Sequence, residues 1–285
     1  MATLNQLRIA ARDIINTTLP DEADYLARTL LCDYLDINLT QLLTRYADTV
    51  DTRAEQDITR MATRIARHEP LQYVVGKAHF GGRTFTVNPH TLIPRPETYE
   101  LTQLIRRNTP PHAAPDILDI GTGSGCIAVT LKCEMPQAQL TALDISREAL
   151  DIARLNAQTH GAHINFLQCD ILTQTIAHAP FDIVVSNPPY ICLKEQADMQ
   201  RNVVDYEPHG ALFVPDDDPL LFYRRIARLC HEDHLLKRGG HLYFEINEAY
   251  GEKTMQMMHN HAFADITIHH DTYGKPRMIR GRLQS

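Results

Sequence analysis

The fold is decided by the stretch ILDIGTGSGCIAV at residues 117–129, where a short apolar run leads into a glycine-rich turn and then into a helical pattern. In an open sheet of parallel strands, ligands bind beyond the carboxyl ends of the strands, and glycines let backbone N–H groups approach the ligand closely. The stretch therefore predicts a small-molecule site at the end of a buried strand.

Outward from this stretch, short apolar segments alternate with helical patterns. The predicted strands are Ile117–Ile120, Leu140–Leu143, Ile164–Leu167, Ile183–Ser186 and Leu242–Ile246. Such alternation is typical of a mostly parallel sheet with helices on both faces. The last two segments, Ala264–His270 and Pro276–Arg282, have little helix between them, so we expect them to pair antiparallel at one edge.

The first part of the chain has a different pattern. From Leu4 to about His68, leucine and isoleucine recur at three- and four-residue steps, which predicts a small bundle of helices. This pattern leaves two roles open, a stabilising domain and a domain that docks a partner. Alternating residues around Gly81-Gly82 then predict a β-hairpin. We therefore expect a helical domain at residues 1–75, a linking hairpin at 76–91 and a large α/β domain at 92–285.

The composition of the 285-residue chain argues against several classes of protein. It carries 28 Lys and Arg against 35 Asp and Glu, a net charge of −7, whereas electrostatic binders of nucleic acid carry a basic excess. No apolar run approaches the ~18 residues of a membrane-spanning helix. The six cysteines form no C-x-x-C pair, which is typical of reduced thiols in a cytoplasmic protein. The run His231-Glu232-Asp233-His234 lacks the spacing of a zinc motif, and we expect no metal.

The glycine-rich turn is compatible with two nucleoside cofactors. A dinucleotide-binding turn has the spacing G-x-G-x-x-G, but here the spacing is G-x-G-x-G and Cys126 stands at the position of the last glycine. At the end of the next predicted strand, Asp144 can accept hydrogen bonds from both hydroxyls of a ribose. The spacing and the acidic Asp119 favour S-adenosylmethionine over NAD. Asp170, after the third strand, lies where we expect the adenine.

A second motif, Asn187-Pro188-Pro189-Tyr190, follows the fourth predicted strand. Two adjacent prolines fix φ and remove two N–H donors, which leaves a rigid turn rich in acceptors. The Asn187 side-chain oxygen and the Pro188 carbonyl could both accept from one planar NH₂ group, with Tyr190 as a flat face beside it. An amide or aromatic amine held in this way would be directed at a sulfonium methyl group, and no strong base is required. The motif alone could be only a turn, but its position in the same crevice as the glycine-rich turn favours a catalytic role.

Four stretches together give the sequence a family resemblance. They are LIPRPET at 92–98, DIGTGSG at 119–125, SNPPYI at 186–191, and YEP at 206–208 followed by Ala211-Leu212. Over nearly its whole length the chain resembles the PrmC/HemK family of peptide chain release factor glutamine methyltransferases. NPPY alone is shared with amine methyltransferases of DNA and RNA, whereas LIPRPET is far more selective. The resemblance implies an α/β fold: a seven-stranded class I, Rossmann-like S-adenosylmethionine-dependent methyltransferase domain, preceded by a helical bundle and a linking β-hairpin.

The resemblance also implies the reaction and the residues that perform it. The enzyme would use S-adenosylmethionine to methylate the side-chain amide nitrogen of the glutamine in the Gly-Gly-Gln motif of release factors. The residues expected to bind the cofactor are Gly121, Thr122, Gly123, Ser124, Gly125, Asp144, Asp170, Ile171 and Asn187. Those expected at the substrate are Asn187, Pro188, Pro189 and Tyr190, with Asn187, Pro188 and Tyr190 as the catalytic group. The N-terminal helices would dock the release factor, and we expect a monomer that needs no direct contact with nucleic acid or membrane.

The sequence departs from the family pattern at three places. Tyr99 stands where an acidic residue is expected, Asn247 stands where the family usually has glycine, and residues 215–219 lack a glycine ahead of the next helix. Because asparagine tolerates left-handed backbone better than most residues, we expect the change at 247 to be mild. Two other functions stay open: methylation of an exocyclic amine of DNA or RNA, and a catalytically silent module that binds the cofactor and docks a translation factor.

Overall fold

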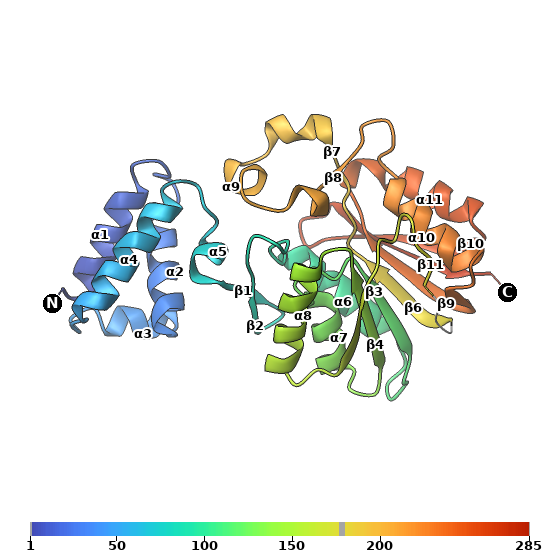
Figure 1. Cartoon of the computed structure of the whole chain (residues 1–285), viewed down its shortest axis with the longest axis horizontal. Coiled ribbons are helices and arrows are strands. Elements are labelled where there is room, and N and C mark those ends of the chain that lie inside the picture. Colours follow the sequence, from blue (N-terminus) through green and yellow to red (C-terminus); the bar gives the residue numbers. More distant parts are fainter. Residues whose placement is uncertain (1, 177–179, 285) are drawn as a thin grey trace. The chain divides into compact units, whose positions relative to one another are not determined.

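The structure is a computed structural model that describes residues 2–176 and 180–284 (Figure 1). The chain forms two compact units. The first runs to Lys77 and also contains Met199–Tyr206, and the second contains Ala78–Asp198 and the chain from Glu207 onward. Within the described ranges, no helix is long and apolar enough to cross a membrane.

The first unit is a bundle of short helices. They are α1 (Leu4–Ile15), α2 (Ala23–Leu35), α3 (Leu39–Thr44), α4 (Thr52–Ile65), α5 (Leu71–Val75) and, in the separate segment, α9 (Arg201–Val204). The first N–H groups of a helix lack partners inside the helix, and side-chain oxygens of Thr3, Asn38 and Asp51 accept from them at the starts of α1, α3 and α4. The predicted helical part is therefore confirmed, with capping residues that define where three of its helices begin.

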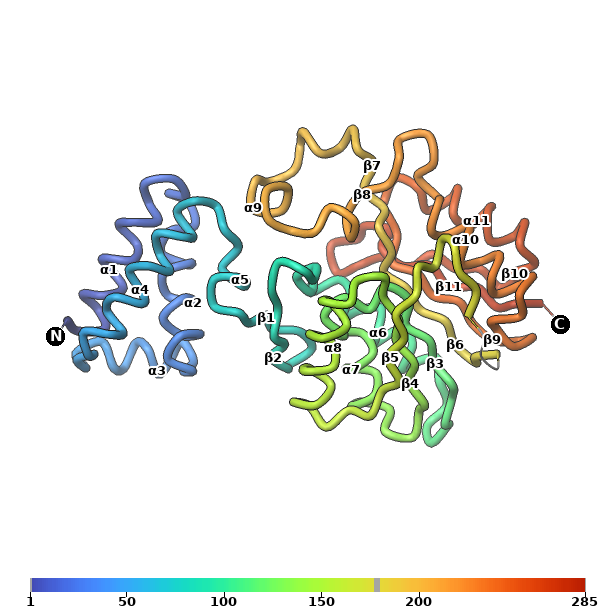
Figure 2. The backbone as a smooth tube through the Cα atoms, viewed as in Figure 1, coloured from blue at the N-terminus to red at the C-terminus, as the bar shows by residue number. Residues whose placement is uncertain are grey.

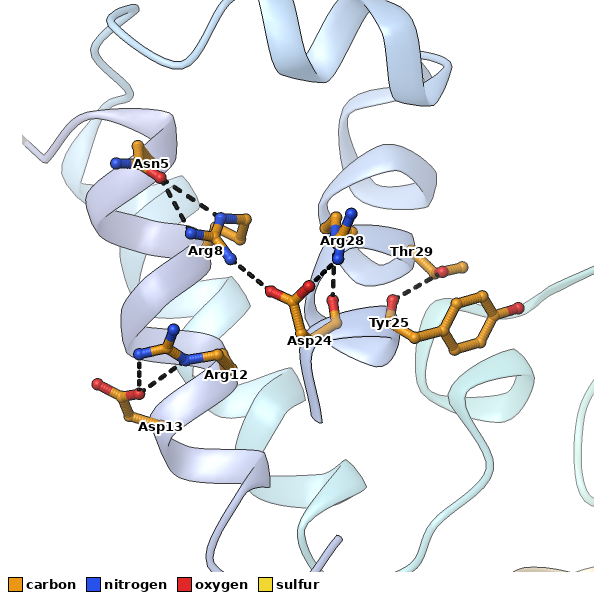
Figure 3. A network of polar contacts seen from close by, with 8 residues as sticks. All are labelled: Asn5, Arg8, Arg12, Asp13, Asp24, Tyr25, Arg28 and Thr29. Atoms are coloured by element: carbon orange, nitrogen blue, oxygen red, sulfur yellow. Dashed lines mark hydrogen bonds and ion pairs between the residues drawn. The ribbon is translucent and has the colours of Figure 1, made fainter. Parts of the chain in front are cut away.

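Apolar side chains and a few polar contacts hold this bundle together. Leucines and isoleucines from α1, α2 and α4 are fully buried between the helices. On the surface, Asp24 of α2 accepts a hydrogen bond from Arg8 of α1 at 2.5 Å and also pairs with Arg28 (Figure 3). Tyr206 donates its hydroxyl to the carbonyl of Arg67 at 2.8 Å, which fastens the segment Met199–Tyr206 to the bundle.

The second unit is built on a seven-stranded sheet with the strand order β10-β11-β9-β6-β3-β4-β5. Its strands are β3 (Asp116–Ile120), β4 (Gln139–Asp144), β5 (Ile164–Gln168), β6 (Phe181–Ser186), β9 (Leu236–Glu245), β10 (Phe263–His270) and β11 (Pro276–Leu283). Strands β5, β4, β3, β6 and β9 pair parallel, whereas β11 pairs antiparallel with both β9 and β10. This confirms the predicted α/β fold, including the antiparallel pair at one edge.

Helices cover both faces of this sheet (Figures 1 and 2). On one face lie α6 (Pro96–Asn108), α7 (Cys126–Glu134) and α8 (Arg147–Thr159), and on the other lie α10 (Leu221–His231) and α11 (Gly251–Asn260). Successive strand residues point to opposite faces, so Ile117 joins the core under the first group while Leu118 joins the core under the second. Burial on both faces explains why the strands read as continuous apolar runs.

Smaller elements lie outside the large sheet. Strands β1 (Lys77–Phe80) and β2 (Arg83–Thr86) form a hairpin whose turn residues, Gly81 and Gly82, have φ of 56° and 73°. Strands β7 (Ile191–Cys192) and β8 (Phe213–Val214) form a short parallel pair that the sequence did not predict. The part of this unit that the structure describes also contains three 3₁₀ helices, η1 (Leu193–Asp198), η2 (His209–Ala211) and η3 (Glu248–Tyr250).

Candidate active site

A pocket of about 360 Å³ lies at the carboxyl ends of β3, β4, β5 and β6. The predicted site residues that line it are Gly121, Gly123, Asp144, Asp170, Ile171, Asn187, Pro188 and Pro189. Two segments outside the sheet complete the wall, with His90 and Leu92 on one and Pro208 and Ala211 on the other. The structure thus brings the glycine-rich turn and the Asn-Pro-Pro turn to one pocket. It places Thr122, Ser124, Gly125 and Tyr190 outside the lining.

The glycine-rich turn between β3 and α7 presents bare backbone to the pocket. Gly121 and Gly123 have φ of 73° and 54°, a region that favours glycine. A Cβ built on either residue would meet no heavy atom within 4 Å, so the space beside the turn is open to a ligand. At Gly125, in contrast, a Cβ would lie 3.1 Å from the Cβ of Ala153 in α8. This last glycine therefore serves close packing of the turn against α8.

A buried carboxyl group lies at the base of this turn. Asp119 accepts a hydrogen bond from the Thr122 hydroxyl through Oδ2 at 2.6 Å, whereas its Oδ1 has no hydrogen-bond partner among the described residues. The Ser124 hydroxyl is also buried without a partner there. Burial raises the pKa of Asp119 to about 7, against the opposing effect of the Thr122 hydrogen bond. Asp119 does not line the pocket itself, and its hydrogen bond to Thr122 holds the turn that does.

Asp144, at the end of β4, forms part of the pocket wall. Its Oδ2 accepts from the backbone N–H of Gly123 and its Oδ1 accepts from that of Ser146, each at 2.9 Å. Burial raises the pKa of Asp144, although these backbone hydrogen bonds act in the opposite direction. The two backbone hydrogen bonds fix the direction of the carboxylate. Each of its oxygens can accept more than one hydrogen bond, so the group can still accept from two hydroxyls of a ligand.

The wall after β4 and β5 has an apolar part. Ile171 is buried, and Ile145 is 63% exposed beside the pocket, so the two offer apolar surface for a flat base. Asp170 accepts from the Leu172 N–H at 3.0 Å and from the Thr173 hydroxyl at 2.8 Å, which closes the turn. The sequence prediction missed Ile145. The signal that could have revealed it is a large apolar residue directly after the acidic end of a strand.

At the Asn-Pro-Pro turn, polar contacts fix the side chain of Asn187. Its Nδ2 donates to the Thr98 hydroxyl at 3.2 Å, and the Thr98 hydroxyl donates to Glu245 at 2.6 Å. The amide NH₂ of Asn187 therefore points to Thr98, and its Oδ1 is the atom left to accept from a ligand. Tyr190 donates its hydroxyl to Glu245 at 3.1 Å, and its ring packs against the core under α10 and α11. Its role as a flat face for the substrate stays a prediction.

A second buried carboxylate supports the pocket from outside the sheet. Glu207 accepts from the backbone N–H of Ile93 at 3.1 Å and from Arg95 at 2.5 Å, and its side chain is 1% exposed. Leu92 and Pro208, the neighbours of this contact in the chain, both line the pocket. The pair thus joins the segment before α6 to the segment before η2.

None of the three departures from the family pattern is among the residues that line the pocket. Tyr99 packs edge-to-face against Phe80 of the hairpin, with ring centroids 5.6 Å apart. We expect the change from glycine to asparagine at 247 to be mild because asparagine tolerates left-handed backbone, but this reason is wrong. The φ of Asn247 is −66°, so the position does not require left-handed backbone. Its side chain instead caps η3 by accepting from the Ala249 N–H at 2.9 Å and donates to the carbonyl of Tyr190 at 3.2 Å.

Comparison with known proteins gives matches along most of the chain. The family model described as "PrmC N-terminal domain" matches residues 6–76, and the "Methyltransferase small domain" model matches residues 100–206. A release factor glutamine methyltransferase of Bacteroides thetaiotaomicron is 43% identical over 261 residues, which cover 91% of this chain and 92% of that protein. A protein of the same name from Streptococcus pneumoniae is 37% identical and covers 86% of each chain. A crystal structure of a methyltransferase from Pyrococcus furiosus shares the fold, with a TM-score of 0.52 and 14% identity over 70% of this chain and 89% of its own.

Proposed function

Because the chain belongs to the family of release factor glutamine methyltransferases, we propose that it methylates the side-chain amide nitrogen of the glutamine in the Gly-Gly-Gln motif of peptide chain release factors. The chain is an S-adenosylmethionine-dependent methyltransferase. We further propose that it works in the cytoplasm as a monomer and needs no nucleic acid for the reaction. Of these proposals, the chemistry of the pocket supports the choice of an amide nitrogen as the methylated atom.

The cofactor pocket fits a nucleoside sulfonium. Gly121 and Gly123 would face its amino acid part with bare backbone, Asp144 would accept from its ribose, and Ile145 with Ile171 would cover its base. When bound, this cofactor supplies an electrophilic methyl group.

The Asn-Pro-Pro turn would hold the substrate amide. An amide nitrogen is a weak nucleophile because its lone pair is delocalised, and two acceptors on its N–H groups increase its electron density and direct the nitrogen. Asn187 would accept through Oδ1, since its NH₂ is bonded to Thr98, and Pro188 would accept through its carbonyl. Positioning of this kind contributes to catalysis without a strong base. The single observation that carries the proposal is this fixed direction of the Asn187 amide beside the glycine-rich turn in one pocket.

Mass spectrometry of a release factor incubated with the protein and S-adenosylmethionine tests the reaction. We expect one added methyl group on the glutamine of Gly-Gly-Gln, and none on a matched release factor with Gly-Gly-Glu, which has no amide NH₂. Asn187→Ala should lower kcat by roughly 100-fold or more with little change in cofactor affinity. Methylation of DNA or RNA in place of the release factor, or cofactor binding without any turnover, would refute the proposal.

We propose in addition that the first unit docks the release factor. Among the described residues of this unit, three large apolar side chains are exposed, namely Tyr25, Leu39 and Leu43, and the Tyr25 ring points away from the polar contacts of Asp24 (Figure 3). Leu39 and Leu43 lie one turn apart on α3 and form a small exposed apolar pair, whereas Tyr25 lies near the start of α2. The family match of this unit, together with these exposed groups, supports the docking role. Replacing all three by serine in the full chain should lower kcat/KM for an intact release factor by about 10-fold.

The same triple variant should leave methylation of a short Gly-Gly-Gln peptide unchanged, because such a peptide has no surface to dock. Tyr273→Ser is a matched control, since Tyr273 is an exposed aromatic residue of the second unit. Equal losses on the intact release factor and on the peptide would contradict a docking role.

A further inference from the structure

A buried acidic side chain stands behind the catalytic turn. Glu245 is the last residue of β9 and is 1% exposed. Ionisable groups are seldom fully buried unless they are paired, and a buried carboxylate without a role in binding or catalysis would reduce stability for no gain. Its two oxygens accept from two hydroxyls, Thr98 at 2.6 Å and Tyr190 at 3.1 Å.

The polarity of these contacts runs in one direction. The Glu245 carboxyl accepts from both hydroxyls, so the Thr98 hydroxyl donates its single proton to Glu245. The lone pairs of Thr98 Oγ1 are then free to accept, and they accept from Nδ2 of Asn187 at 3.2 Å. The carboxylate thereby determines, through one hydroxyl, which end of the Asn187 amide faces Thr98 and which end faces the pocket.

Without the acceptor at Glu245, the side-chain amide of Asn187 could rotate by about 180°, which exchanges the positions of Oδ1 and Nδ2. The Thr98 hydroxyl could then donate to Oδ1 of Asn187, and the NH₂ group of Asn187 would face the pocket. Two NH₂ groups, one on Asn187 and one on the substrate amide, would then oppose each other. A group that must accept from the substrate would have become a donor, although the shape of the site would be unchanged.

We propose that Glu245 is a positioning residue for methyl transfer, which fixes Asn187 through Thr98 and holds Tyr190 directly. This inference rests on the proposed function of the pocket. One carboxylate thus controls the residues on both sides of Pro188-Pro189. The carbonyl of Glu245 accepts from the buried Tyr223 hydroxyl at 3.1 Å, which holds the end of β9 against α10. Burial raises the pKa of the Glu245 carboxyl, and the hydrogen bonds from Thr98 and Tyr190 favour its ionised form.

A purely structural role is the alternative, and the two differ in what a mutation changes. A structural role predicts loss of stability with normal kcat in the molecules that remain folded. A positioning role predicts loss of kcat at nearly unchanged cofactor affinity. The chain offers a matched control in Thr102, which lies one turn after Thr98 in α6, is equally buried, and donates its hydroxyl to the carbonyl of Tyr99 in its own helix at 2.7 Å.

The experiment compares Thr98→Val, Thr98→Ser and Thr102→Val in the full chain, with kcat measured on a Gly-Gly-Gln substrate. Valine keeps the shape of threonine but can neither donate to Glu245 nor accept from Asn187. We expect Thr98→Val to lower kcat by about 10- to 100-fold. Thr98→Ser keeps the hydroxyl and should stay within about threefold of the unmodified protein, as should Thr102→Val.

Glu245→Gln provides a second route if Thr98→Val does not fold. Glutamine has the size of glutamate but presents one NH₂ group, so Thr98 or Tyr190 loses its acceptor. We expect kcat to fall by about 10-fold or more, with the dissociation constant of S-adenosylmethionine, measured by calorimetry, within about twofold. Calorimetry also reports whether each variant is folded.

The outcomes separate this inference from the proposed function. If the unmodified protein does not methylate the glutamine, the proposed function fails. If it does, but Thr98→Val and Glu245→Gln both keep the kcat of Thr102→Val, the positioning role of Glu245 is refuted and the proposed function stands. The role is also refuted if Thr98→Ser loses as much kcat as Thr98→Val, because the hydroxyl would then not be the group that matters.

Discussion

Replacing Asp119 by asparagine should change how the stability of the protein depends on pH. Burial raises the pKa of this carboxyl from 3.8 to about 7 in the folded chain. In the unfolded chain the pKa returns to its ordinary value, so between about pH 4 and pH 7 the folded state binds more protons than the unfolded state. The free energy of unfolding therefore falls as the pH rises through this window. Above the window Asp119 is ionised in both states and adds no further pH dependence, although its full destabilising effect remains.

The size of the effect follows from the two pKa values. Linkage between 3.8 and about 7 gives a loss of about 2.5 kcal/mol from pH 5 to pH 8 in the unmodified protein, and Asp119→Asn removes it. Asparagine also places an NH₂ group where Oδ1 has no partner, which costs roughly 1–3 kcal/mol at every pH. The change with pH is thus the quantity to test. Urea unfolding of both proteins at four pH values measures it, and a difference that stays constant from pH 5 to pH 8 would refute the reasoning.

Three further predictions concern the pocket, the hairpin and the cap of η3. Asp144→Ala should weaken S-adenosylmethionine binding by about 10- to 100-fold in calorimetry, because hydrogen bonds to a charged group contribute roughly 1.5–3 kcal/mol; an unaltered affinity removes Asp144 from the site. Gly81→Ala should lower the free energy of unfolding by roughly 1–3 kcal/mol, since the new Cβ would lie 2.5 Å from the Tyr99 ring; additive effects of Gly81→Ala and Tyr99→Leu would contradict this contact. Asn247→Ala should cost about 1 kcal/mol through loss of the cap on η3, and unchanged urea unfolding would show that the cap contributes nothing.

The sequence predicted the sheet well, because strands buried on both faces are continuous apolar runs and the turns between them contain glycine or proline. It did not predict where β9 begins. Residues 237–240 are Lys-Arg-Gly-Gly, which suggests a turn, yet β9 starts at Leu236 and passes through this segment with an irregularity in its pairing to β6. At Gly240 a Cβ would lie 2.8 Å from one backbone carbonyl and 2.9 Å from another, so the glycine serves a close approach of two strands.

The supports of the site could not be predicted from spacing. Thr98 and Glu245 are far apart in the chain, and only the fold places the start of α6 beside the end of β9. Glu207 and Ile93 are a similar case. The predicted residues that face the pocket follow strands and carry a local signal, whereas the residues that hold them in place are identified by three-dimensional contacts alone. Tyr99 is likewise explained by a three-dimensional contact, because its ring packs against Phe80 of the hairpin.

The segment Met199–Tyr206 has a consequence for how such proteins can be recombined. It belongs to the first unit although it is inserted in the sequence of the second, and Gln200, Arg201 and Asn202 line a groove together with Leu19, Leu26 and Ile65 of the bundle. A chimera made with one crossover near Lys77 would pair the bundle of one parent with the inserted segment of another. Exchange of the helical unit between relatives therefore requires two coordinated transplants, and mismatched hybrids should be the less stable class.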